Sequence, residues 1–223
     1  MGFLSYYVAI LVASYLLRFP LLIPLVLVFW ALRHRIPDPY VWARTAGHIH
    51  RLRQQVEANP ANAVARRDLA RLHLERFRPR AALGLLDEAL ARHPDDAEML
   101  YLKGIAHLRA GEAGAALDPV VRAIELDGRI GFGDPYRVAG DALVALGRLE
   151  EAEDAYERFT EMNSSSLEGL YKLTLVRSRR GDRQGAQLAL DELFRTHRQL
   201  PAFSRRRQVG WWLRAQLARF FMI

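Results

Sequence analysis

The chain has 223 residues, a formal net charge of +7 and no cysteine. The absence of cysteine excludes disulfide frameworks, thiolate catalysis and metal sites built on cysteine. The positive charge lies at both ends: residues 1–58 hold six arginines against two acidic residues, and residues 195–223 hold seven arginines and no acidic residue. The middle of the chain is mildly acidic, so it lacks the basic stripe that indicates nucleic-acid binding, and we predict no nucleic-acid partner.

Residues 1–35 begin with a long apolar run that contains one charge, Arg18, and is followed at its end by Trp30, Arg33 and Arg35. A helix of about 30 residues is long enough to cross a hydrocarbon core of about 30 Å. No basic residue precedes the run, so it is more typical of a retained anchor than of a cleaved signal peptide. The sequence predicts a membrane anchor here, with these four residues in contact with the membrane.

The path of this anchor stays open at the sequence level. Pro20 follows Arg18 and Phe19 and disfavours a continuous helix there, so the segment is either one kinked span or a re-entrant hairpin. Arginines follow the run and none precedes it, which places the rest of the chain in the cytoplasm. The predicted location is a bacterial inner membrane, with membrane lipids as partners. Residues 36–42 predict a short, stiff linker, because they contain Pro37 and Pro39.

Small residues recur at a fixed interval after residue 62. Alanines of the expected second helices are spaced by 34, 36 and 34 residues, at Ala82, Ala116, Ala152 and Ala186. A close-contact position of the first helices carries Ala70, Gly104, Gly140 and Thr174, and the turn between helices carries Phe77, Gly111, Gly147 and Gly181. This period and pattern resemble the tetratricopeptide repeat (TPR), a hairpin of two helices. Such hairpins stack because one hairpin alone cannot bury its apolar face.

The resemblance implies an all-α fold. It predicts a TPR helical-hairpin solenoid of about four repeats over residues 63–200, with the transmembrane or re-entrant helix at the N-terminus. A leading helix is expected over residues 43–62, and a basic, aromatic C-terminal helix over residues 201–223. Residues 131–135 contain a two-residue insertion that lengthens one loop between repeats.

In TPR proteins the first helices line a concave groove that holds partner segments, and the fifth position of each repeat usually faces it. Arginine and tyrosine stand at these positions, and both are common anchors at protein interfaces. The bland interpretation is that they are ordinary solvated residues. The predicted partner-binding residues are Arg67, Arg71, Tyr101, Ile105, Arg137, Asp141 and Tyr171. Some relatives clamp acidic chaperone tails with a fixed set of basic and amide residues; here only Arg67 and Arg71 fit that set, so no such clamp is predicted.

The C-terminal helix carries one predicted apolar stripe, made of Val209, Trp212, Leu213, Leu217, Phe220 and Phe221. Two interpretations remain open. The helix caps the last repeat with this stripe, as solenoids require. Alternatively it lies in a membrane interface, with its aromatic residues among lipid headgroups and its arginines on anionic lipid. The residues predicted to contact lipid are Trp211, Trp212, Phe220 and Phe221.

The sequence contains no phosphate-binding loop, nucleophile elbow or zinc-protease motif. His48 and His50 are two residues apart and face different sides of a helix. We therefore expect no enzyme activity, cofactor or metal site. The predicted function is a membrane-anchored scaffold or assembly factor that binds proteins in the TPR groove. The alternative is a structural accessory subunit of a larger membrane complex, with other transmembrane subunits as partners; Arg18 would favour it, because a charge within a membrane usually needs a partner.

Overall fold

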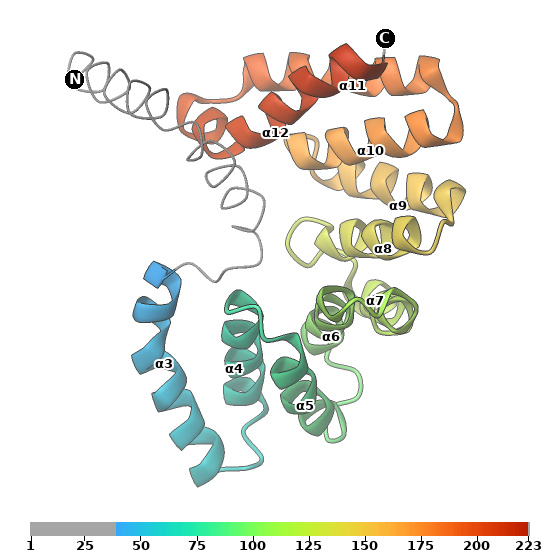
Figure 1. Ribbon diagram of the computed structural model, residues 1–223. Helices are drawn as coiled ribbons and strands as arrows, with labels where there is room; N and C mark the ends of the chain where they lie inside the picture. Colours follow the sequence, from blue (N-terminus) through green and yellow to red (C-terminus); the bar gives the residue numbers. More distant parts are fainter. Residues whose placement is uncertain (1–38, 223) are drawn as a thin grey trace, which may run out of the picture.

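The computed structural model describes residues 39–222, which form ten helices and no strand. They are α3 (Pro39–Ala58), α4 (Ala63–Glu75), α5 (Pro79–Leu90), α6 (Ala97–Ala110), α7 (Ala113–Asp127), α8 (Asp134–Ala145), α9 (Leu149–Met162), α10 (Leu167–Arg180), α11 (Arg183–Gln199) and α12 (Ala202–Met222). Figure 1 shows them stacked along a curved solenoid, which confirms the predicted all-α architecture. The predicted N-terminal membrane helix lies outside the described residues.

The solenoid consists of four hairpins with an extra helix at each end. The hairpins are α4–α5, α6–α7, α8–α9 and α10–α11, and each second helix also packs against the first helix of the next hairpin. Helix α3 packs against α4, and α12 packs against both α10 and α11 (Figure 1). Because α3 begins at Pro39, residues 39–42 are helical, contrary to the linker predicted there.

Polar side chains define where four of the helices begin. Each N-cap side chain accepts a hydrogen bond from a backbone N–H three residues later, at 2.8–3.2 Å. This satisfies one of the N–H groups that have no partner within the helix. The capping residues are Asn62, Asp96, Ser166 and Asp182.

The turns inside the hairpins confirm the predicted turn positions. Gly111, Gly147 and Gly181 have φ angles of 84°, 77° and 85°, and Phe77 has 55°. Glycine adopts this left-handed conformation freely, whereas a residue with a side chain pays about 1–2 kcal/mol. The turn of the first hairpin, at Phe77, is therefore less favourable in free energy than the glycine turns of the other three hairpins.

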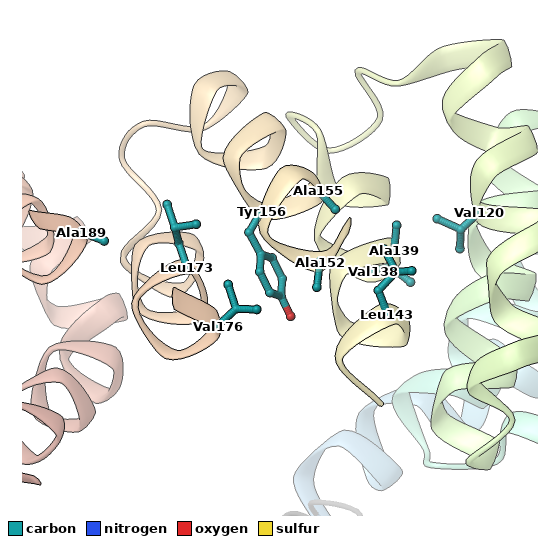
Figure 2. Packing of buried hydrophobic residues seen from close by; sticks show 10 residues of the cluster. All are labelled: Val120, Val138, Ala139, Leu143, Ala152, Ala155, Tyr156, Leu173, Val176 and Ala189. Atoms are coloured by element: carbon teal, nitrogen blue, oxygen red, sulfur yellow. The ribbon is translucent and has the colours of Figure 1, made fainter. Parts of the chain in front are cut away.

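Small residues stand where neighbouring helices approach most closely, as the repeat pattern predicts. A Cβ atom added to Gly104 would lie 2.0 Å from Cγ2 of Val120, and one added to Gly140 would lie 2.5 Å from the Tyr156 ring. Figure 2 shows Tyr156 inside the apolar cluster that joins the second, third and fourth hairpins. The interval of small residues therefore reflects steric contact between backbones and large neighbouring side chains.

The C-terminal helix caps the last hairpin with a different face from the one predicted. Ala215 is fully buried, and Trp211 and Trp212 are partly buried against the last hairpin. The predicted stripe is wrong for its aliphatic members, because the small Ala215 lets the helix approach with this other face. The exposed members are Val209, Leu213 and Leu217. The side chains of Phe220 and Phe221 lie outside the described part.

Candidate functional site

The fifth-position residues predicted to bind a partner form polar contacts between successive repeats. In the first three hairpins each contacts an acidic residue in the first turn of the next first helix. Acidic residues are favourable there because the N-terminus of a helix carries partial positive charge. The pairs are Arg67 with Glu98 (Nη1 to Oε2, 2.8 Å), Tyr101 with Asp134, and Arg137 with Glu168 (Nη1 to Oε1, 3.5 Å).

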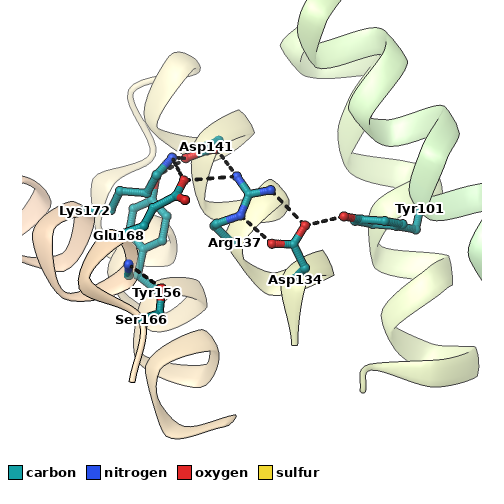
Figure 3. A network of polar contacts seen from close by, with 9 residues as sticks. Tyr101, Asp134, Arg137, Asp141, Tyr156, Ser166, Glu168 and Lys172 are labelled. Carbon is teal, nitrogen blue, oxygen red and sulfur yellow. Dashed lines mark hydrogen bonds and ion pairs between the residues drawn. The ribbon is translucent and has the colours of Figure 1, made fainter. Parts of the chain in front are cut away.

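Arg137 lies at the centre of the polar contacts around α8, which Figure 3 shows. Its Nη2 donates to Oδ2 of Asp134 at 2.8 Å, and its Nη1 donates to Oδ2 of Asp141 at 3.1 Å. Asp141 also accepts a hydrogen bond from the Tyr156 hydroxyl at 2.7 Å and forms an ion pair with Lys172. Arg137 and Asp141 are therefore held by neighbours within the chain. We call this group, together with the three inter-repeat pairs, the polar ladder.

The pKa values within the polar ladder favour the ordinary charge states. Burial alone would raise the pKa of Asp134, but the hydrogen bonds and charge of Arg137 outweigh it and lower the pKa. Burial and the negative charge of Asp134 raise the pKa of Tyr101, and burial and Asp141 raise that of Tyr156. At neutral pH Asp134 is therefore charged, and Tyr101 and Tyr156 are neutral. The ladder is suited to holding repeats together, not to transferring protons.

A pocket of about 350 Å³ opens on the groove between α4, α6 and the inserted loop. Its apolar surface comes from leucine, isoleucine and tyrosine side chains, and charges of both signs surround it. The lining residues are Arg71, Leu74, Glu75, Glu98, Tyr101, Leu102, Ile105, Arg109, Ile130 and Gly131. Arg109 is fixed in this wall, because its Nη1 donates to the backbone oxygen of Leu74 at 2.6 Å.

The inserted loop forms one wall of this pocket through an unusual backbone. Gly131, Phe132 and Gly133 all have positive φ angles, of 55°, 59° and 85°. This conformation brings Ile130 and Gly131 to the groove and leaves Phe132 76% exposed. Sequence reasoning located the insertion but missed that it completes a pocket. Its two glycines were the available signal, because glycine adopts the left-handed conformation without the steric cost of a side chain.

The structure divides the seven predicted groove residues into two groups. Three of them, Arg71, Tyr101 and Ile105, line the pocket. Of these three, Tyr101 also belongs to the polar ladder and Arg71 also forms an ion pair with Glu98. The other four do not line the pocket: Tyr171 packs against Trp211 at 5.7 Å between ring centroids, and the rest belong to the polar ladder. Arg109 and Ile130 line the pocket and were not among the predicted residues.

The tryptophans predicted to lie among lipid headgroups are packed against protein instead. Trp211 contacts the ring of Tyr171, and the guanidinium carbon of Arg214 is 4.4 Å from the centroid of the Trp211 ring. Trp212 stacks on His197 at 5.3 Å. The other predicted membrane contacts, Arg18, Trp30, Arg33 and Arg35, precede the described residues. Among residues 39–222 no group of three or more acidic or histidine residues is placed to hold a metal ion.

Comparison with known proteins identifies the repeats. The family model of the tetratricopeptide repeat matches residues 67–129 and 137–176. A TPR repeat-containing protein of Methanocaldococcus jannaschii, MJ1428, is 33% identical over 122 residues, which cover 54% of this chain and 21% of that protein. The chain thus spans about a fifth of the length of this relative. None of these matches indicates a catalytic family.

Solved structures with the same fold include several TPR proteins. MamA has a TM-score of 0.64 at 22% identity, over 70% of this chain and 92% of MamA. YrrB, described as a TPR protein with an unusual peptide-binding site, has a TM-score of 0.59 at 18% identity, over 74% and 90%. TTC0263 of Thermus thermophilus has 0.58 at 17%, over 78% and 93%. At these identities the likeness establishes the fold.

The predicted localisation in a bacterial inner membrane is wrong. Between residues 39 and 222 no helix is long and apolar enough to cross a bilayer, and the matching structures are the TPR proteins MamA, YrrB and TTC0263. The prediction depended on residues 1–35, which the structure does not describe. The accessory-subunit alternative depended on Arg18 in the same segment and stays a prediction.

Proposed function

We propose that this protein, whose chain contains tetratricopeptide repeats, is a scaffold that binds an extended segment of a partner protein along its concave groove. One apolar side chain of that segment enters the pocket formed by α4, α6 and the inserted loop. The TPR fold itself indicates a protein-interaction scaffold. The position and chemistry of the bound segment are the part that we infer.

The pocket carries this proposal. Its volume of about 350 Å³ suits one large side chain with some of its backbone, and Leu74, Leu102 and Ile105 provide an apolar surface for it. A buried anchor of this kind usually supplies most of the binding energy of an interface. Arg71 and Glu75 stand beside it and offer hydrogen bonds of both polarities to the flanking backbone.

The polar ladder supports the same function by fixing the groove. Two ion pairs and the hydrogen bond from Tyr101 to Asp134 connect the first helices α4, α6, α8 and α10, so the groove keeps its curvature without a ligand. A pre-organised groove loses less conformational entropy on binding than a mobile one. YrrB, which has the same fold, is described as binding peptide, and this likeness supports a peptide-sized ligand.

A random-peptide display library panned against the full chain tests the proposal. We expect the selected peptides to share one large aliphatic or aromatic residue. Ile105→Glu should weaken their binding about tenfold or more, which corresponds to about 1.4 kcal/mol, because it places a charge in the apolar pocket. Ile130→Glu, in the loop wall of the same pocket, should act in the same direction without altering a helix.

The matched control is Val121→Glu. Val121 is 47% exposed on α7 and does not line the pocket, so the same added charge should leave peptide binding unchanged. Urea unfolding of each variant separates lost binding from lost folding. Selected peptides that bind the folded Ile105 and Ile130 variants as well as they bind the unaltered chain would show that the groove pocket is not the binding site.

A further inference from the structure

The outer face of α12 carries aliphatic side chains that the solenoid leaves uncovered. Val209, Leu213 and Leu217 are 45%, 52% and 61% exposed. They are four residues apart, so on a helix with 3.6 residues per turn they lie within about 80° of one another. Ala215, which packs against the last hairpin, lies on the opposite side. The three residues form one stripe about 12 Å long.

Arginines surround this stripe. From the same helical geometry Arg206 lies within its arc, Arg207 and Arg214 lie on one flank, and Arg205 lies on the other. Helix α12 contains no acidic residue. Among residues 39–222 none of these arginines forms an ion pair with a carboxylate. We call these four arginines and the three aliphatic residues the α12 surface.

The first helix α10 shows how a comparable apolar face is covered inside the solenoid. Helix α10 also follows a complete hairpin, and its Leu173 and Val176 are buried between α9 and α11. Helix α12 packs against α10 and α11 on one side, and no further helix among residues 39–222 covers its other side. By analogy, a further helix has the right shape to cover the exposed face of α12.

We propose that the α12 surface binds an amphipathic helix of a partner protein whose apolar face is flanked by acidic residues. The stripe accepts the apolar face, and the flanking arginines pair with the acids, which is the charge complementarity that selects partners at protein interfaces. A second copy of α12 is disfavoured as the occupant because both helices would be basic. Trp211 and Trp212 pack against the last hairpin, so this face does not present these two tryptophans to a lipid surface.

The probe is a synthetic, fluorescently labelled peptide of about 20 residues, long enough to form a helix, with leucines on one face and glutamates beside them. A peptide with the same residues in scrambled order and one with lysine in place of glutamate serve as comparisons. Binding to the full chain is measured by fluorescence anisotropy. We expect the amphipathic acidic peptide to bind at least about tenfold more tightly than either comparison peptide, a difference of about 1.4 kcal/mol.

Two variants place the binding on α12. The double variant Leu213→Gln/Leu217→Gln removes the apolar stripe, and Arg206→Glu/Arg207→Glu reverses the charge beside it. Each should weaken peptide binding about tenfold or more. All four side chains lie on the outer face, so folding should be unaffected. The matched controls, which should bind normally, are Leu188→Gln (Leu188 is 62% exposed on α11) and Arg129→Glu, at an exposed residue of the inserted loop.

Three results would overturn the proposal. The scrambled peptide binds as tightly as the amphipathic one, which would mean charge attraction without a docked helix. The α12 variants bind the peptide normally, which would place the binding elsewhere. Vesicles of phosphatidylglycerol bind in an α12-dependent manner while the peptide does not, which would make this a lipid-binding face. Because Ile105→Glu changes the groove alone, failure here is distinguishable from failure of the groove proposal.

Discussion

The contact between Gly104 and Val120 gives a sharp prediction about what holds the two helices of a hairpin together. Gly104 lies inside α6, where alanine is normally preferred over glycine by about 1 kcal/mol. The substitution Gly104→Ala should nevertheless destabilise the protein, because the added Cβ would lie 2.0 Å from Cγ2 of Val120. Two carbon atoms in favourable contact are about 3.5–4.0 Å apart, so the two helices or the valine must move by about 1.5–2 Å.

The surroundings of Val120 place the cost at the upper end of the usual range. Its side chain is fully buried in the main apolar cluster, and a β-branched side chain in a helix has one strongly preferred rotamer. Overpacking of this kind costs about 1–3 kcal/mol. After the gain in helix propensity is subtracted, we expect Gly104→Ala to lower the free energy of unfolding by about 2 kcal/mol.

Gly84→Ala is the matched control, because a Cβ added to Gly84 in α5 would meet nothing within 4 Å. It should raise the free energy of unfolding by about 1 kcal/mol. Urea unfolding followed by circular dichroism measures both. Combining Gly104→Ala with Val120→Ala should cost less than the two single changes added together, by about 1–2 kcal/mol, because the new methyl group fills part of the space that the valine leaves. The reasoning is refuted if Gly104→Ala and Gly84→Ala stabilise the protein equally.

Three further predictions follow from the polar contacts. Arg137→Met should lower the free energy of unfolding by about 1.5–3 kcal/mol, because it removes charged hydrogen bonds to the half-buried carboxylates of Asp134 and Asp141. Arg158→Met, at a side chain that is 67% exposed, should change it by less than about 0.5 kcal/mol, and equal effects would contradict a structural polar ladder. Asn62→Ala removes the N-cap of α4 and should cost about 1 kcal/mol in urea unfolding, and no change would mean that water replaces the cap. Burial and three nearby arginines lower the pKa of His73 below 6.5, so the unfolded chain takes up the proton at a higher pH than the folded chain. The free energy of unfolding should therefore fall as the pH drops below 6.5. The variant His73→Phe should make that fall shallower, and an unchanged pH profile would contradict this assignment.

The repeat architecture was predictable because its cause is local and recurs. Where two helix backbones approach, only a small residue fits, and Gly104 and Gly140 show this directly through Val120 and Tyr156. Such contacts repeat once per hairpin and leave a period in the sequence. The same holds for the turns, since a left-handed residue is needed at the end of each first helix.

The sequence predicted the helices that carry the fifth-position residues but not the contacts that these residues make. The fifth-position residues do stand along the first helices, but their acidic partners lie about one repeat further along the chain. Arg67 and Glu98 illustrate this, since their pairing depends on how two hairpins stack. The acidic residue at the start of each following first helix was a signal that could have been read. The role of the inserted loop depended on the path of three residues with positive φ angles, which a sequence pattern does not specify.

The orientation of the C-terminal helix could not be decided from periodicity. Its apolar residues cover more than half of the helix circumference, so more than one face was a candidate for the buried side. The structure buries the face around Ala215, where Gln208 adds a polar contact by accepting a hydrogen bond from the backbone N–H of Leu167 at 2.8 Å. Packing against a small residue, with two tryptophans beside it, outweighs the burial of three aliphatic side chains.

The two proposed binding surfaces differ in chemistry, and this difference separates them experimentally. The groove pocket is apolar with charges of both signs around it, so raising the salt concentration should change peptide binding there only slightly. The α12 surface depends on arginines in contact with solvent, whose attraction is screened beyond about 10 Å at 0.1 M salt and beyond about 3 Å at 1 M. A partner that binds both surfaces should therefore lose its α12 contact first as salt increases. At high salt, binding should be weakened by Ile105→Glu but not by Leu213→Gln/Leu217→Gln. At low salt, both changes should weaken binding.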